Sequence, residues 1–145
     1  MKVDREEYIG HKVIKLSHQI DRKISKSVAQ YGVTGIQAKI IGFVYGESAK
    51  REIFQKDIEE KFDVRGSSVT SVLNLMENNG YIKRVSVEED ARLKKIVLQE
   101  KGLEIQSVVM QSIISVEDRL SSAVSEEELK TLLELVDKLS EKLAE

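Results

Sequence analysis

The fold is decided by residues 65–99, which read RGSSVTSVLNLMENNGYIKRVSVEEDARLKKIVLQ. Within this stretch, positions 69, 72, 73 and 76 are apolar, which is the spacing of a helix that buries one face. The other face has short uncharged side chains, namely Ser67, Thr70, Ser71, Asn74 and Asn78. Such a face can approach and hydrogen-bond another surface, as a helix in a DNA major groove of about 12 Å must. A solvated face that lacks charge is the alternative.

The neighbouring segments complete a recognisable pattern. Residues 53–62 predict a short helix with Phe54, Ile58 and Phe62 on one side, and residues 63–66 predict a tight turn before the polar-faced helix. Two short helices joined by such a turn are typical of a helix-turn-helix, although helical hairpins also occur in ordinary cores. After Gly80, residues 81–87 and 94–99 are rich in β-branched side chains and predict an antiparallel hairpin with its tip at 88–93. A hairpin at this place makes a winged helix.

Long helices are predicted on both sides of this region. Residues 4–30 predict one helix that ends at Gly32, with an apolar stripe formed by Tyr8, Ile9, Val13, Leu16, Ile20, Ile24 and Val28. Thr34 and Gln37 have the spacing of a capping box that opens the next helix, which is followed by a loop at 46–49.

The C-terminal segment predicts two further helices. The first runs from Gly102 to about Ala123, and Ser125 with Glu128 forms a capping box for the second. The second helix has a heptad seam made of Leu129, Leu132, Val136, Leu139 and Leu143. We expect these outer helices to form a shared dimer interface, and an intramolecular helix pair is the alternative.

Composition narrows the class of protein. The chain has 145 residues, 41% hydrophobic and 33% charged, which suits one folded domain with a core. Because no Cys is present, disulfides, thiol redox sensing and Cys-ligated zinc are excluded. The first residues lack the apolar core of a signal peptide, and no run approaches about 18 apolar residues. We therefore expect a cytoplasmic protein.

The net charge of −2 is unevenly distributed. Residues 1–47, 48–101 and 102–145 have net charges of +3, +1 and −6, so the acidic excess lies in the last segment. Basic side chains bracket the polar-faced helix: Arg65, Lys83, Arg84, Arg92, Lys94 and Lys95. A local basic patch for nucleic acid is therefore compatible with an acidic chain.

The expected fold class is mainly α with a small β-wing: a winged helix-turn-helix domain flanked by long N- and C-terminal helices. A chain of this kind resembles the MarR family of winged-helix transcriptional regulators. Four collinear stretches carry the resemblance: residues 32–37 as a helix start, 64–70 as the turn into the recognition helix, 75–84 as its exit, and Asp90, Arg92, Leu98 and Gly102 as the wing signature. Gln99 departs from the family pattern, which usually has Thr there as a helix cap.

The resemblance implies one MarR-like domain spanning 1–145. Residues 1–31 and 102–145 would be dimerisation helices, and residues 32–101 the DNA-binding lobe. It further implies a transcriptional regulator, in most cases a repressor, that binds a pseudo-palindromic double-stranded DNA operator as a homodimer. The recognition helix 67–79 would lie in the major groove, with the wing 81–99 beside it.

Ten side chains are expected to face the DNA: Arg65, Ser67, Ser68, Thr70, Ser71, Asn74, Arg84, Asp90, Arg92 and Lys94. Arg65 starts the helix, and its planar guanidinium suits guanine or phosphate. Arg92, supported by Lys94, would contact the minor groove or a phosphate, and the resemblance implies that Asp90 holds it. From the residues alone, Asp90 and Arg92 are equally compatible with a surface ion pair worth under about 1 kcal/mol. Arg84 is equally compatible with a strand-edge charge that deters aggregation.

The resemblance also implies release from DNA by a small phenolic or aromatic effector. The candidate pocket-lining side chains are Tyr8, His11, His18, Tyr31, Phe43 and Tyr45. His11 and His18 are two helical turns apart, which favours surface or interface positions over metal ligands, and no metal or other cofactor is expected.

An enzyme is not expected, because the sequence has no recognisable nucleophile-and-base motif and no glycine-rich phosphate loop. The remaining alternative is a winged helix that acts as a protein–protein interaction module without specific DNA binding. Its interface would be the acidic C-terminal helices. The wing residues and the uncharged helix face favour DNA instead.

Overall fold

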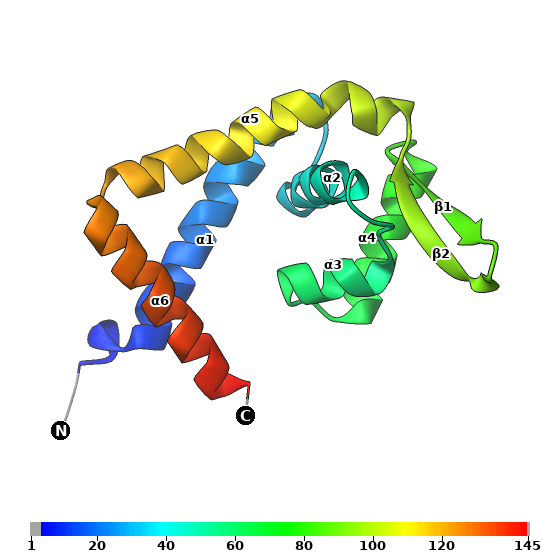
Figure 1. Ribbon diagram of the computed structural model, residues 1–145. Helices are drawn as coiled ribbons and strands as arrows, with labels where there is room; N and C mark the ends of the chain where they lie inside the picture. The colour runs from blue at the N-terminus through cyan, green and yellow to red at the C-terminus, as the bar shows by residue number, and fades with distance from the viewer. Residues whose placement is uncertain (1–3, 145) are drawn as a thin grey trace. The chain divides into compact units, whose positions relative to one another are not determined.

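The computed structural model describes residues 4–144 and forms two compact units, Met1–Ile113 and Ile114–Glu145. In chain order the elements are η1 (Arg5–Glu7), α1 (Ile9–Val28), η2 (Ala29–Tyr31), α2 (Gly35–Ser48), α3 (Gln55–Phe62), α4 (Gly66–Asn78), β1 (Ile82–Val87), β2 (Asp90–Leu98), α5 (Glu100–Ser122) and α6 (Glu126–Leu143). Strands β1 and β2 form an antiparallel hairpin directly after α4 (Figure 1). The predicted fold class, mainly helical with a small β-wing, is confirmed.

The core of the first unit is enclosed by α2, α3, α4, the hairpin and the first part of α5. Its buried side chains are Val28, Val33, Ala38, Ile40, Ile41, Val44, Ile53, Ile58, Val69, Leu73, Met76, Tyr81, Ile82, Ile96 and Val109. Burial of this many large apolar side chains is the main force that holds α4 and the hairpin in place.

Helix α2 lies at the centre of this core. Its predicted capping box is confirmed: Thr34 Oγ1 accepts from the Gln37 backbone N–H at 3.3 Å, and Gln37 Oε1 accepts from the Thr34 N–H at 3.0 Å. The predicted loop at 46–49 is wrong, because α2 continues to Ser48. A glycine inside a helix costs only about 1 kcal/mol, which the burial along α2 outweighs at Gly46.

Helix α1 is shorter than the predicted 4–30. Residues 5–7 form a 3-10 turn and Tyr8 is extended (φ −68°, ψ 135°), so the α-helix begins at Ile9. Its C-terminal end packs on α2 and buries Ile24 and Val28, and Gly32 ends the segment at φ 79°, as predicted. The predicted dimerisation segment 1–31 includes residues 1–3, which lie outside the described residues.

Helix α3 begins at Gln55 instead of the predicted residue 53. Phe54 is extended and forms a β-bridge with Lys95, while Asp57 Oδ2 accepts from the Phe54 N–H at 2.8 Å. A strand partner far away in the sequence therefore sets where this helix starts. No local pattern reports that pairing.

The turn between α3 and α4 contains a left-handed residue, Asp63, at φ 50°. Val64 N–H donates to the Glu59 carbonyl at 3.2 Å and closes the turn. Helix α4 then starts at Gly66, one residue before the predicted 67–79, and ends at Asn78.

The hairpin pairs Ile82 with Leu98 and Ser86 with Lys94, with a register shift between Ser86 and Val87. Because Val87 then pairs with Asp90, the tip is shorter than the predicted 88–93. Gly80, at φ 81°, makes the sharp exit from α4 that the sequence predicts.

The prediction that Gly102 opens helix α5 is wrong, because the helix begins at Glu100 and Gly102 lies inside it. Gln99 provides the entry, with its N–H donating to the Tyr81 carbonyl and its own carbonyl accepting from Leu103 N–H, both at 2.9 Å. A Cβ on Gly102 would overlap the Tyr81 carbonyl oxygen. Glycine is needed here because backbone approaches backbone.

The second unit consists of the end of α5 and helix α6. The predicted capping box is confirmed: Glu128 N–H donates to Ser125 Oγ at 3.1 Å, and Ser125 N–H donates to Glu128 Oε1 at 3.0 Å. In α6, which ends at Leu143, no side chain is buried, and the exposed fractions of Leu132, Val136 and Leu139 are 48%, 48% and 41%. Residue 145 of the predicted segment 102–145 lies outside the described residues.

Candidate nucleic-acid interface

Helix α4 divides into a buried apolar face and an exposed polar face, as predicted. Val69, Leu73 and Met76 are buried in the core, and Val72 is half-buried. The exposed face carries Ser67, Ser68, Thr70, Ser71 and Asn74. No long charged side chain lies among these five residues, so a flat partner can approach the helix backbone.

Two hydroxyls on this face are held by the backbone. Thr70 Oγ1 donates to the Gly66 carbonyl at 2.8 Å and accepts from Gln55 Nε2 at 2.8 Å, while Ser71 Oγ donates to the Ser67 carbonyl at 3.1 Å. Both hydroxyl protons are therefore used within the helix, and the oxygens keep acceptor capacity outward. Gln55 was not predicted from the sequence. Its side chain hydrogen-bonds to Gly66 and Thr70 and so connects α3 to the start of α4, and no sequence periodicity indicates this contact.

Arg84 links the first strand of the hairpin to α4. Its Nη2 donates to Asn74 Oδ1 at 2.6 Å and to Glu77 Oε1 at 3.0 Å, and its backbone N–H donates to Glu77 Oε2 at 2.8 Å. Hydrogen bonds from the Arg84 side chain and backbone lower the pKa of Glu77 below its ordinary value, so this carboxylate is ionised at neutral pH. Glu77 was missed as a functional residue, although the exit motif at 75–84 contained it.

At the tip of the wing, the exposed Arg92 is hydrogen-bonded to Asp90. Arg92 has a side chain that is 92% exposed, and Asp90 Oδ1 accepts from both its backbone N–H at 2.9 Å and its Nε at 3.3 Å. Lys94 Nζ donates to Ser86 Oγ at 2.8 Å on the same hairpin. The predicted pairing of Asp90 with Arg92 is therefore present.

Arg65 stands at the N-cap position of α4 and is exposed. Within residues 4–144 its side chain makes no hydrogen bond or ion pair, so its guanidinium is available to a partner. Partial positive charge at the helix N-terminus adds to its own charge and favours an anion such as phosphate.

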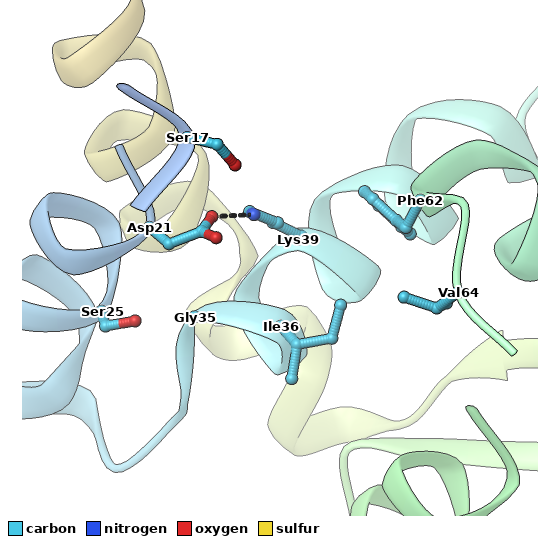
Figure 2. A pocket seen from close by; sticks show the side chains of 8 residues that line it. All are labelled: Ser17, Asp21, Ser25, Gly35, Ile36, Lys39, Phe62 and Val64. Carbon is cyan, nitrogen blue, oxygen red and sulfur yellow. Dashed lines mark hydrogen bonds and ion pairs between the residues drawn. The ribbon is translucent and has the colours of Figure 1, made fainter. Parts of the chain in front are cut away.

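A cavity of about 490 Å³ lies between α1, the start of α2 and the turn after α3 (Figure 2). It is lined by Ser17, Asp21, Ser25, Gly35, Ile36, Lys39, Phe62 and Val64. An ion pair between Lys39 and Asp21 crosses one side, and Ile36, Phe62 and Val64 provide an apolar side. Its volume lies within the range of small-molecule sites, and its walls combine polar and apolar side chains.

The six side chains expected to line an effector pocket are not among the eight that line this cavity. Tyr8 precedes α1, Tyr31 lies in η2 and Tyr45 in α2, and all three are exposed. His11 and His18 line a shallow depression of about 320 Å³ on α1. Phe43 packs edge-to-face on Phe62, with ring centroids 5.9 Å apart, beside a second depression of about 340 Å³.

The described part of the chain has neither a metal-binding cluster nor a membrane-spanning helix. Residues 4–144 contain no group of three or more His, Asp or Glu side chains placed to hold a metal ion. No helix among the same residues is both long and apolar enough to span a membrane.

Comparison with known sequences identifies relatives. Residues 31–93 match the model of the MarR family. HTH-type transcriptional regulator PecS of Dickeya dadantii is 28% identical over 127 residues, which cover 86% of this chain and 76% of PecS. HTH-type transcriptional regulator PapX of Escherichia coli is 27% identical over 96 residues, which cover 64% of this chain and 58% of PapX. The chain thus matches little more than half of PapX. These relatives are transcriptional regulators, not enzymes.

Solved structures share the fold. The S. aureus MepR–DNA complex contains a chain that is 23% identical and superimposes with a TM-score of 0.88, covering 97% of this chain and 99% of that one. The transcription regulator MarR from Oenococcus oeni is also 23% identical, with a TM-score of 0.81 and coverages of 92% and 99%.

Proposed function

We propose that the chain is a MarR-family regulator, a sequence-specific, double-stranded DNA-binding protein that acts as a homodimer, on the ground that residues 31–93 match the model of that family. One recognition helix, α4, enters a major groove in each half of a pseudo-palindromic operator, and the hairpin lies beside it. The protein represses its target genes and is released by a small effector.

The observation that carries this proposal is the exposed face of α4. Its short uncharged side chains follow Arg65 at the helix start, and the hairpin that comes directly after α4 presents the cations Arg92 and Lys94. Short polar groups suit base edges and cations suit phosphates, so one surface offers both kinds of contact. That a protein of the same fold, MepR, was crystallised with DNA supports this use of the fold.

Homodimer formation is supported by apolar side chains that the chain leaves exposed. In α1, Ile9, Val13 and Leu16 have exposed fractions of 61%, 52% and 46%, and α6 exposes Leu132, Val136, Leu139 and Leu143 of its heptad seam. Such faces mark interaction surfaces when they are contiguous along a helix. In this proposal a second copy of the chain covers them.

Effector release is supported by the cavity beside Lys39. The Lys39–Asp21 ion pair supplies a polar wall and Ile36, Phe62 and Val64 an apolar wall, so a small aromatic acid would bind by displacing Asp21 from Lys39 (Figure 2). The cavity borders both α1 and the turn that leads into α4, so an occupant that binds one arrangement of these elements better shifts their equilibrium. Displacement of bound DNA by small aromatic acids tests this part of the proposal.

The proposal is tested by binding of the purified protein to its own upstream DNA and to random duplex of equal length, at two salt concentrations. We expect salt-sensitive binding with at least about 1000-fold preference for the upstream fragment. Arg92→Ala should lower affinity about tenfold for both DNAs and reduce the salt dependence, because a phosphate or groove contact is lost.

Arg119→Ala is the matched control. It also removes an exposed arginine side chain, but from α5, and should leave the affinity for DNA unchanged. If Arg92→Ala and Arg119→Ala behave alike, the wing does not touch DNA. Absence of binding to either duplex at low salt would instead favour the protein–protein interaction module.

A further inference from the structure

Asn74 sits in the middle of the exposed face of α4, where a base-reading side chain would be placed, and its amide is not free to turn. The amide oxygen Oδ1 accepts from Arg84 Nη2 at 2.6 Å. Arginine has only donors, so the group that faces it must be the oxygen and not the amino group. The orientation of the amide, which is often ambiguous, is therefore fixed by its partner.

Arg84 is itself fixed by Glu77. Both carboxylate oxygens of Glu77 are engaged, one by the Arg84 side chain at 3.0 Å and the other by its backbone N–H at 2.8 Å. The Arg84 side chain is only 24% exposed. The chain of contacts therefore runs from Glu77 through Arg84 to Asn74, and each contact is charge-assisted and short.

The amino group of Asn74 is what remains for a partner. Within the described residues its Nδ2 has no hydrogen-bond acceptor, and the side chain is exposed. An asparagine that reads adenine with two bonds uses its oxygen and its amino group together. The bond from Arg84 leaves the oxygen one lone pair, whereas the amino group keeps both of its N–H donors, so a base with acceptors only, such as guanine with O6 and N7, becomes the better partner.

We infer that Asn74 is a specificity-determining residue that selects guanine over adenine at one base pair of each half-site, and that Arg84 and Glu77 act as positioning residues behind it. This inference rests on the proposed DNA-binding function. It also reassigns Arg84, which reads from the sequence as a direct DNA contact, to a role exerted through Asn74.

The experiment selects bound sites from a random duplex library with the wild-type protein, Asn74→Ala and Arg84→Met, and compares base preferences at each position. With the wild type we expect one guanine per half-site whose preference falls about five- to tenfold in Asn74→Ala. Arg84→Met should shift the same position toward adenine, because the released amide can offer both of its groups. A merely structural role for Arg84 would lower affinity at all positions alike.

Matched controls come from the same elements. Asn78→Ala makes the identical truncation one turn further along α4, and Lys83→Met removes an exposed cation next to Arg84. Both should retain the wild-type motif. Since Asn74 is exposed, Asn74→Ala is expected to fold, and its thermal unfolding curve verifies that independently of Arg84→Met.

The outcomes separate the two levels of the proposal. If the wild type enriches a motif but Asn74→Ala enriches the same motif at full strength, the role of Asn74 is overturned and DNA binding stands. Adenine in place of guanine at the Asn74-dependent position also overturns it. If the wild type enriches no sequence, the proposed function fails and the inference fails with it.

Discussion

The winged-helix lobe and helix α6 use the same kinds of side chain to opposite effect. In the lobe, leucine, isoleucine and methionine side chains such as Leu73, Ile41 and Met76 are fully buried against one another. In α6, no residue is buried, although its heptad seam is as apolar as any stripe in the chain. The lobe closes its own core, whereas α6 leaves its apolar seam open to solvent.

This difference indicates which surfaces need a partner. Each fully buried aliphatic side chain contributes roughly 1.5–3 kcal/mol of hydrophobic stabilisation, and an exposed one contributes little. The order of the lobe therefore depends on contacts within one chain. We propose that the order of α6 and of the first turns of α1 depends on a second chain.

The same truncation at a buried and at an exposed position of α4 gives the largest expected contrast. Leu73→Ala should destabilise the protein by about 2–5 kcal/mol, because it opens a cavity in a closed core. The measurement is urea-induced unfolding at fixed chain concentration. Leu75→Ala on the same helix, where the side chain is 52% exposed, is the control and should cost under about 1 kcal/mol. Equal costs at the two positions would mean that the core does not carry the stability of the lobe.

Introducing a charge into the α6 seam should act on assembly and not on the lobe. Leu139→Glu places a carboxylate on the surface that the proposed dimer buries, and we expect the dimer dissociation constant to rise at least about tenfold. Sedimentation at several chain concentrations measures it. Ser140→Glu puts the same charge on the next, off-seam position and should leave assembly intact. A monomeric wild-type protein would contradict the dimer directly.

The smallest effect concerns two carboxylates, one in each region. The Arg84 side chain lowers the pKa of Glu77, and the backbone N–H of Ser125 lowers that of Glu128. A pKa that is lower in the folded state stabilises the protein above the unfolded value of about 4.3, and this contribution is lost as pH falls through the folded pKa. Glu77→Gln should therefore destabilise the protein at pH 7 by under about 1 kcal/mol, and by progressively less as the pH falls toward 3.

Glu128→Gln extends this measurement to α6. Gln can still accept the cap hydrogen bond, so only the charge is lost and the change should be smaller than for Glu77→Gln. Unfolding midpoints recorded from pH 3 to pH 7 for both variants test this order. A difference from wild type that is constant across that range would show that ionisation of these groups does not contribute.

What the sequence predicts well is local. The capping boxes at Thr34 and Ser125 and the glycine exit at Gly80 are confirmed, because each depends on residues within one helical turn of one another. The buried stripe of α4 is confirmed for the same reason, since its period is visible in the chain. These signals suffice for the winged-helix fold class.

What the sequence does not predict depends on residues far apart in the chain. The late start of α3 depends on a bridge between Phe54 and Lys95, and the wall of the cavity depends on Asp21 meeting Lys39. The link from Arg84 to Asn74 is of the same kind. Such pairs have no periodic signature, so the polar face of α4 is predictable while the orientation of its central amide is not.

The hydrogen bonds from Arg92 to Asp90 affect the conformational entropy that Arg92 loses on binding. A free surface arginine loses about 0.5–1.5 kcal/mol of side-chain conformational entropy when a partner immobilises it. Here one carboxylate oxygen already engages both the backbone N–H and Nε of Arg92, while the terminal guanidinium nitrogens stay in solvent. Part of the conformational entropy of the Arg92 side chain is therefore lost already in the free protein, so the side chain is partly preorganised for binding.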